Sequence, residues 1–331
     1  MQLYLDEWGA SLHVREGMFV VRCKEQEDRS FAIERVRHIV LMPGTRITTD
    51  AIMRAVQRQI EVHIVQRNGE PVGMFWSHRY GSISTIRINQ AHFVKSQAGR
   101  EWIKSQIIDR IKGQQGHLAG LRRRRRALEP VIDQTIELLS KAINRIQALD
   151  SETAGGFRDS LRGLEGTASR QYFQTISQII PEEYAFERRQ RPNARDPFNV
   201  ALNYQLGMLY NRVEGALIKA GVDPYMGVYH RNMWGKPVLT YDFIEPFRVW
   251  AEAMTVHLCF ARALPPEMFT PTENGALLLN KGGKKIVVPA FNEYLEQVVD
   301  WRGRRRSRGA HIILAAQDLA QRLLKWEEND K

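Results

Sequence analysis

Residues 61–82, EVHIVQRNGEPVGMFWSHRYGS, contain the point at which the hydrophobic pattern of the chain changes from that of strands to that of helices. Two runs rich in β-branched and aromatic residues flank Asn68-Gly69, a pair typical of a two-residue hairpin turn. After Tyr80–Ser82, apolar residues recur three and four positions apart, as they do on one face of a helix. The sequence therefore predicts a β-rich domain over residues 1–84 and a helical domain over residues 85–331.

The first domain carries several more strand signals. Leu12–Arg15 and Met18–Val21 are separated by Glu16-Gly17, so a second hairpin is expected there. Thr48 is a suitable N-cap for a short helix over residues 51–57. These signals describe a small β-rich domain with one short helix. Its other expected strands are Phe31–Ile33, His38–Leu41, Glu61–Val65 and Val72–Trp76.

The remaining residues predict a larger all-α domain, which makes the fold class α+β. Helical spacing of apolar residues is sustained over long stretches, and Gly221 is a natural C-terminal stop for one of them. A small hairpin is expected where Leu277–Leu279 and Ile286–Val288 bracket Lys281–Gly283. The expected helices cover residues 93–111, about 118–149, 157–180, 199–220, 241–263, 289–299 and 310–326.

Positive charge is concentrated in the expected helical domain. The chain has a formal net charge of +11, yet residues 1–84 carry 11 Lys/Arg and 10 Asp/Glu. The excess positive charge on residues 85–331 favours a polyanionic partner such as nucleic acid. A basic surface that is exposed only to solvent would also account for it.

Three further features concern the compartment. No apolar run reaches the ~18 residues that a membrane span needs, and the N-terminal residues lack the pattern of a secretory signal. Cys23 and Cys259 lie far apart in sequence and are expected to be reduced thiols. We therefore expect a cytoplasmic protein that is not bound to a membrane.

Carboxylates and one imidazole stand out in three separate segments. Glu165 lies between two glycines in a helical stretch, and a glycine costs a helix about 1 kcal/mol. Close approach of a ligand or of another backbone is one reason for a glycine there, and plain helix packing is another, commoner one. His230 follows a glycine-rich turn, while Asp242 and Glu245 are three residues apart and would share a face of a helix. This donor mix suits Mg²⁺ or Mn²⁺. Taken singly, the acids also fit a helix cap or an exposed surface, and the histidine a hydrogen-bonded loop.

In their order along the chain, Glu165–Phe173, Gly227–His230 and Asp242–Arg248 resemble the motifs of the CRISPR spacer-acquisition integrases, the universal "Cas-one" family. The resemblance is close over residues 160–260. It implies a metal-dependent DNA endonuclease and integrase that inserts short DNA fragments into a CRISPR repeat array by 3′-hydroxyl transesterification. It also implies that Glu165, His230 and Asp242 bind Mg²⁺ or Mn²⁺, with Glu245 as a further catalytic acid. Val249 stands where the family often has proline.

The resemblance further implies partners. These are double-stranded DNA (the prespacer and the CRISPR repeat), a second copy of the chain bound through the β-rich domain, and a small ferredoxin-like "Cas-two" protein. Arg122–Arg126 would encircle a helix, so only part of this run could follow a phosphate track. Residues 301–308 are expected to be a mobile segment that DNA orders. The expected DNA-binding residues are Arg188, Arg189, Arg191, Arg195, Arg248, Arg304 and Arg305. Arg248 could instead be a structural salt-bridge partner of the acids beside it.

Two other functions remain open from the residues alone. A stand-alone, structure-specific DNA repair nuclease would use the same acids and basic surface. A non-catalytic nucleic-acid-binding scaffold would use the acids only as helix caps, and its processing of DNA would not depend on Glu165, His230 or Asp242.

Overall fold

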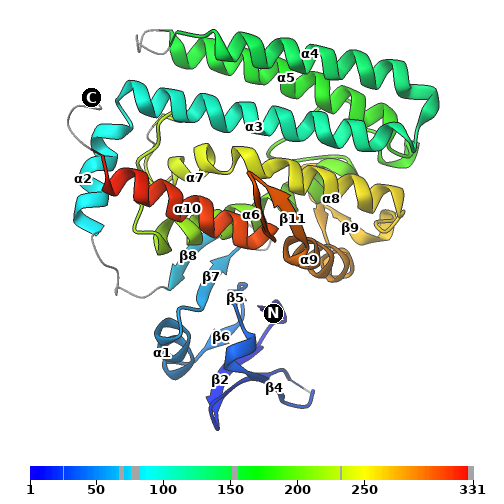
Figure 1. Cartoon of the computed structure of the whole chain (residues 1–331). Helices are drawn as coiled ribbons and strands as arrows, with labels where there is room; N and C mark the ends of the chain where they lie inside the picture. Colours follow the sequence, from blue (N-terminus) through cyan, green and yellow to red (C-terminus); the bar gives the residue numbers. More distant parts are fainter. Residues whose placement is uncertain (25, 67–70, 76–82, 151–155, 232, 327–331) are drawn as a thin grey trace. The chain divides into compact units, whose positions relative to one another are not determined.

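The computed structural model describes residues 1–24, 26–66, 71–75, 83–150, 156–231 and 233–326. The chain divides into two compact units, Met1–Gly81 and Ser82–Lys331 (Figure 1). The first is rich in strands and the second is mostly helical, so the expected α+β fold class is confirmed. Among the described residues, none of the helices combines the length and the apolar character that crossing a membrane requires.

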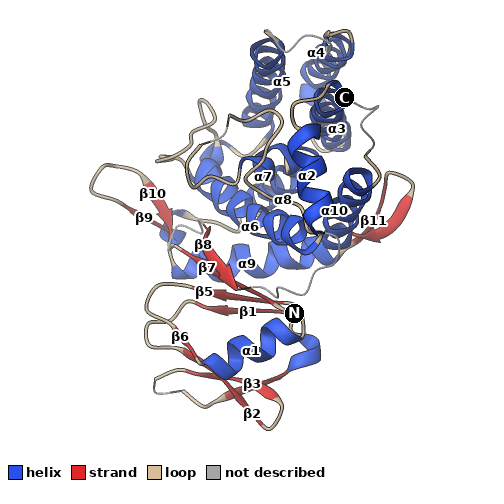
Figure 2. Cartoon of the chain, turned by 90° about the vertical axis from the view of Figure 1, so that its left-hand side faces the viewer, coloured by secondary structure: helices blue, strands red, loops and turns tan. Residues whose placement is uncertain are grey.

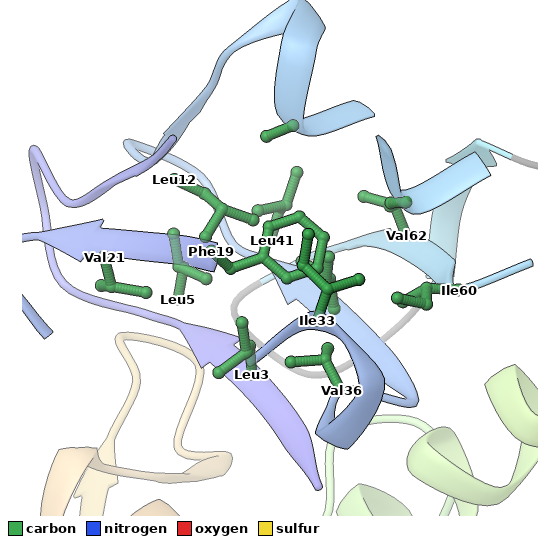
Figure 3. Packing of buried hydrophobic residues seen from close by; sticks show 13 residues of the cluster. Leu3, Leu5, Leu12, Phe19, Val21, Ile33, Val36, Leu41, Ile60 and Val62 are labelled. Carbon is green, nitrogen blue, oxygen red and sulfur yellow. The ribbon is translucent and has the colours of Figure 1, made fainter. Parts of the chain in front are cut away.

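The first unit contains two four-stranded sheets, one in the order β1-β5-β7-β8 and one in the order β4-β3-β2-β6 (Figure 2). A hydrophobic core built from both sheets and α1 includes Leu5, Leu12, Phe19 and Val62 (Figure 3). The elements are β1 Gln2–Leu5, β2 Ser11–Arg15, β3 Met18–Arg22, β4 Arg29–Ala32, the 3₁₀ helix η1 Ile33–Arg35, β5 His38–Leu41, β6 Arg46–Ile47, α1 Thr49–Gln57, β7 Glu61–Val65 and β8 Pro71–Phe75.

The turn and cap predictions of this unit are confirmed, whereas Ile33, expected at the end of a strand, lies in η1. β2 and β3 pair antiparallel across Glu16 and Gly17, whose φ angles of 51° and 73° are those of a primed hairpin turn. The side chain of Thr48 caps α1 by accepting a hydrogen bond from the amide of Ala51. β7 and β8 pair antiparallel, whereas Asn68-Gly69 between them lies outside the described residues.

Neighbouring residues of β5 and β7 face opposite sides of their sheet. Both are central strands, and they pair in parallel register with His38 beside Glu61 and Ile39 beside Val62. Ile39 and Val62 belong to the hydrophobic core. Because strand side chains alternate, His38 and Glu61 lie on the face away from that core.

The second unit is built around long helices. α3, α4 and α5 pack side by side, and α6 packs against α8 and α10 (Figure 1). The helices are α2 Ile83–Phe93, α3 Gln97–Arg122, η2 Arg126–Leu128, α4 Glu129–Gln147, α5 Phe157–Ile179, η3 Glu182–Tyr184, α6 Pro197–Lys219, α7 Val238–Phe243, η4 Glu245–Phe247, α8 Arg248–Phe260, η5 Pro266–Met268, α9 Lys281–Glu296 and α10 Arg308–Leu324. Two small hairpins accompany them, formed by β9 Phe269–Pro271 with β10 Leu277–Leu279 and by β11 Val298–Trp301 with β12 Arg304–Ser307.

The hairpin expected over residues 277–288 is wrong. Residues 277–279 do form a strand, but its partner is β9, and α9 begins at Lys281. The side chain of Asn280 caps α9 by accepting from the amide of Gly283. A Cβ on Gly283 would lie 2.7 Å from the carbonyl oxygen of Met268. Close packing, and not a turn, therefore requires glycine at this position.

Two expected helices are interrupted, and residues 301–308 contain regular structure. The helix expected over 118–149 is interrupted, since α3 ends at Arg122 and α4 starts at Glu129, so Arg122–Arg126 does not lie on one continuous helix. The helix expected over 241–263 consists of α7, η4 and α8, because Pro246 has no amide hydrogen to continue a helix. Residues 301–308 cover the end of β11, a turn, β12 and the first residue of α10, with Arg302 and Gly303 at φ 49° and 72° in the turn.

Candidate active site

Glu165 lies in the middle of α5 with both carboxylate oxygens engaged. Oε1 accepts a hydrogen bond from Nη1 of Arg110 at 2.9 Å, and Oε2 accepts from the hydroxyl of Tyr229 at 3.0 Å. Burial and the Glu165 carboxylate raise the pKa of Tyr229, which keeps its hydroxyl protonated as a donor. A Cβ at Gly163 or Gly166 would meet nothing within 4 Å. Packing within the chain therefore does not require these glycines, and the helix surface beside Glu165 is open to a ligand.

Asp242 is fully buried and anchors the loop that carries His230. Its Oδ2 accepts from the amides of Val228 and Tyr229 at 2.7 and 2.9 Å. Its Oδ1 accepts from the amide of His230 at 3.1 Å and lies 2.6 Å from Nδ1 of the same residue. These bonds fix the orientation of the ring and leave Nε2 as the nitrogen that can bind a ligand. A Cβ on Gly227 would lie 2.9 Å from Asp242 Oδ2, so the turn needs glycine there.

Glu245 is a buried acid held between two guanidinium groups. Its Oε2 accepts from Nη1 of Arg110 at 2.7 Å, and its Oε1 accepts from Nε of Arg248 at 2.7 Å. Burial alone would raise the pKa of Glu245, but the charges of Arg248 and Arg110 outweigh that effect and lower it. Glu245 is thus ionised at neutral pH.

Arg110 joins the acids of three helices. The same Nη1 atom contacts Glu165 and Glu245, and Nη2 lies 3.5 Å from Oε1 of Glu252. The carboxylates of Glu245 and Glu252 outweigh the effect of burial and raise the pKa of Arg110, so its charge is permanent. Sequence reasoning missed this residue. Its signal was an arginine among the buried isoleucines of one face of α3, such as Ile107.

The four expected residues therefore form one connected network. Tyr229 links them, since its hydroxyl contacts Glu165 and its amide contacts Asp242. Asp242 accepts from a different segment instead of capping its own helix, so the capping alternative does not describe it. The ligand atoms of Glu165, His230 and Asp242 do not all lie within 4.8 Å of one another. In the described part of the chain, one group of potential metal ligands meets that criterion, and it lies in the first unit.

Comparison with known proteins agrees with the motifs. The profile of the family described as "CRISPR associated protein Cas1" matches residues 3–293. The chain belongs to the Cas1 family. It is 27% identical to "CRISPR-associated endonuclease Cas1 1" of Archaeoglobus fulgidus, over 96% of this chain and 95% of that protein. It is 28% identical to a protein of the same description from Thermus thermophilus, over 98% and 96%.

Solved structures share the Cas1 fold. A CAS1 protein from Thermotoga maritima superposes with a TM-score of 0.78 at 20% identity, covering 99% of this chain and 98% of that one. A casposase bound to its integration product superposes with a TM-score of 0.81 at 22% identity, covering 99% and 91%.

The arginines before α6 differ in what they contact in this Cas1-family chain. Arg189 donates to the side-chain oxygens of Asn199 and Asn203, and burial lowers its pKa to about 10. Arg191 donates to the hydroxyl of Tyr210 at 2.9 Å and also stacks over its ring. Both make contacts within the chain, but Arg189 is partly buried whereas Arg191 is exposed. Arg188 and Arg195 have exposed side chains.

The other arginines that are expected to bind DNA are Arg248, which lies beside Glu245, and Arg304 and Arg305 of the β11–β12 hairpin. Arg248 is bound to Glu245 and is largely buried, which makes it a partner of the acids. Arg304 pairs with Asp318 at 2.8 Å on the surface, a contact that a phosphate could replace at little cost. Arg305 is exposed.

Proposed function

We propose that this chain is a metal-dependent DNA endonuclease and integrase that inserts short DNA fragments into a CRISPR repeat array by transesterification. The observation that carries this proposal is the joining of Glu165, His230 and Asp242, from three separate segments, into one hydrogen-bonded network. Family membership supports it, since relatives are described as CRISPR-associated endonucleases and a neighbour in fold as a casposase bound to an integration product.

The donor types of Glu165, His230 and Asp242 suit a hard divalent cation, although their ligand atoms do not all lie within 4.8 Å of one another. Glu165 supplies a carboxylate that is 22% exposed, and His230 is 36% exposed with Nε2 available. Asp242 uses all four acceptor positions of its carboxylate on the loop, so it would exchange one of these hydrogen bonds for a metal bond. We propose that these three residues hold Mg²⁺ or Mn²⁺. The ion would polarise the scissile phosphate and ease ionisation of the attacking hydroxyl.

The chain's own residues position the reactants and balance charge. No protein nucleophile is needed, because the 3′ hydroxyl of the incoming duplex forms the new O–P bond while the 3′ oxygen of the repeat strand leaves. Arg110 and Arg248 neutralise Glu245, so the negative charge next to a bound phosphate is limited. Tyr229 holds Glu165 in place. Attack by water at the same site would cut DNA.

The partners follow from the same proposal. Double-stranded DNA, as prespacer and as CRISPR repeat, would meet exposed arginines of the second unit, namely Arg188, Arg191, Arg195, Arg304 and Arg305. A homodimer formed through the β-rich unit and a small Cas-two protein would complete the assembly. One solved neighbour in fold is a chain of a structure described as a "Cas6-RT-Cas1--Cas2 complex", and this chain covers 35% of that chain's length. We place the protein in the cytoplasm.

A strand-transfer assay tests the proposal. The chain is mixed with a Cas-two protein, a labelled short duplex with free 3′ hydroxyls, a supercoiled plasmid with CRISPR repeats, and Mn²⁺ or Mg²⁺. We expect label on the plasmid, lost with EDTA and in His230→Ala. Cutting of branched DNA without joining would indicate a repair nuclease, and binding without metal-dependent chemistry a scaffold.

A further inference from the structure

Two histidines and a glutamate meet on the sheet of the first unit, far along the chain from the acids of α5 and α7. His38 on β5 is the direct cross-strand neighbour of Glu61 on β7, and His63 follows Glu61 by two residues. All three side chains therefore lie on one face of the sheet. This face is opposite the hydrophobic core, which holds the intervening Val62.

One carboxylate oxygen lies between the two rings. Oε2 of Glu61 is 2.8 Å from Nδ1 of His38 and 3.0 Å from Nε2 of His63. One ligand atom from each residue lies within 4.8 Å of the other two. The side chains of Glu61 and His63 are each 5% exposed, and that of His38 is 14% exposed.

The donor types and their spacing fit zinc. Zn²⁺ bonds to histidine nitrogen and carboxylate oxygen at about 2.0–2.2 Å, so neighbouring ligands of a tetrahedral ion lie roughly 3.3–3.5 Å apart. The observed 2.8 and 3.0 Å would have to open by only a few tenths of an ångström, which side-chain rotation supplies. Two histidine nitrogens with a single carboxylate oxygen favour zinc over Mg²⁺ and Ca²⁺, whose ligands are mostly oxygen atoms.

The backbone preorganises these ligands. Glu61 and His63 come from one strand, and hydrogen-bonded pairing with β5 sets the position of His38. We propose that His38, Glu61 and His63 bind one Zn²⁺ ion, with the fourth position taken by water or by one further donor. This site is independent of the integrase proposal, and the ion stabilises the first unit because it binds the folded chain.

Zinc content of the full-length chain tests the site. In a Glu165→Gln/His230→Ala background, which weakens the other metal-binding candidate, the protein is stripped with EDTA, dialysed against Zn²⁺ and analysed for metal. We expect about one zinc per chain. Adding His63→Ala or His38→Ala should remove most of it. His13→Ala, which changes a part-buried histidine of β2 that contacts Ser11, should retain it.

Two further measurements cover variants that fold poorly. Zn²⁺ should raise the melting temperature of the background protein, and this shift should vanish in His38→Ala, the variant of the most exposed ligand. Co²⁺ in place of Zn²⁺ should give the visible absorption of a tetrahedral site. A zinc content below about 0.2 per chain in the background, or equal zinc content in all folded variants, would overturn the proposal and leave a metal-free hydrogen-bonded triad.

Discussion

Nδ1 of His230 lies 2.6 Å from Oδ1 of Asp242, a carboxylate that is completely buried and also accepts three backbone amides. This pair determines which ring nitrogen of His230 faces outward. The Gly-x-x-His turn and the Asp-containing helix are thus two halves of one structure. The two motifs therefore depend on each other physically, because the 228–230 turn and Asp242 hold each other's geometry through these hydrogen bonds.

Asp242→Asn should damage both folding and activity. An amide offers one acceptor where the carboxylate offers two, so its NH₂ group would face an amide donor of the 228–230 turn or the His230 ring. We expect the free energy of unfolding to fall by about 1–3 kcal/mol, and strand transfer to be lost. Asp223→Asn is the matched control, because Asp223 accepts one amide in an exposed turn. Unchanged strand transfer in a folded Asp242→Asn protein would contradict the role assigned to this carboxylate.

Two glycine substitutions compare a glycine that close packing requires with a glycine that it does not. Gly227→Ala would place a Cβ 2.9 Å from Asp242 Oδ2, so we expect a loss of about 1–3 kcal/mol of stability, seen in urea unfolding. Gly116 is an exposed residue of α3 where an added Cβ would meet nothing within 4 Å, so Gly116→Ala should instead stabilise the chain by about 1 kcal/mol. Equal effects of the two changes would show that the Gly227 turn is not under this constraint.

Gly166→Ala should uncouple stability from activity. Since a Cβ there meets no atom of the chain, the helix should gain about 1 kcal/mol. If DNA approaches α5 beside Glu165, the added methyl group should lower strand transfer several-fold while the melting temperature rises. Full activity in the stabilised variant would place the DNA away from this helix surface.

Arg110→Met should be among the most destabilising single changes in the second unit. It leaves Glu245 and Glu252 as buried acids that have lost a cationic partner, at a cost of about 3–5 kcal/mol. Arg302→Met is the control, since Arg302 also pairs with an acid, Asp109 of α3, but at a more exposed position. This control substitution should cost under about 1 kcal/mol. Chemical denaturation of both variants gives the comparison. A smaller loss for Arg110→Met than for Arg302→Met would refute the account of this network.

His117 should make the chain sensitive to mild acid. Burial lowers its pKa from 6.5 to about 4, and its Nδ1 lies 2.7 Å from the hydroxyl of Tyr172. The unfolded chain binds a proton at a higher pH than the folded chain does, so stability is lost as the pH falls from 6.5 through 4. His117→Gln should flatten the dependence of the melting temperature on pH in this window. The same slope in the variant would mean that other groups cause it.

Local sequence signals predicted the first unit well because they act over a few residues. Glu16-Gly17 and Thr48 specified a turn and a cap that formed as expected. Gly283 was misinterpreted because a glycine required by a close carbonyl and a glycine required by a turn look the same in sequence.

The ordered motifs predicted which residues of the candidate site meet, but not how. The bridging role of Arg110 depends on α3, α5 and η4 coming together, which no spacing within one segment reveals. The anchoring of Asp242 by the 228–230 turn likewise requires the folded chain. For the same reason, no spacing within one segment predicts that His38 meets Glu61, because the two residues come from different strands.

Anomalous diffraction from crystals of the full chain grown with Mn²⁺ tests the central claim most directly. We predict a manganese peak roughly 2.1 Å from a carboxylate oxygen of Glu165 and from Nε2 of His230, in contact with Asp242 directly or through water. That peak should disappear in crystals of Glu165→Gln. A well-ordered structure with no manganese between Glu165 and His230 at saturating Mn²⁺ would contradict the account.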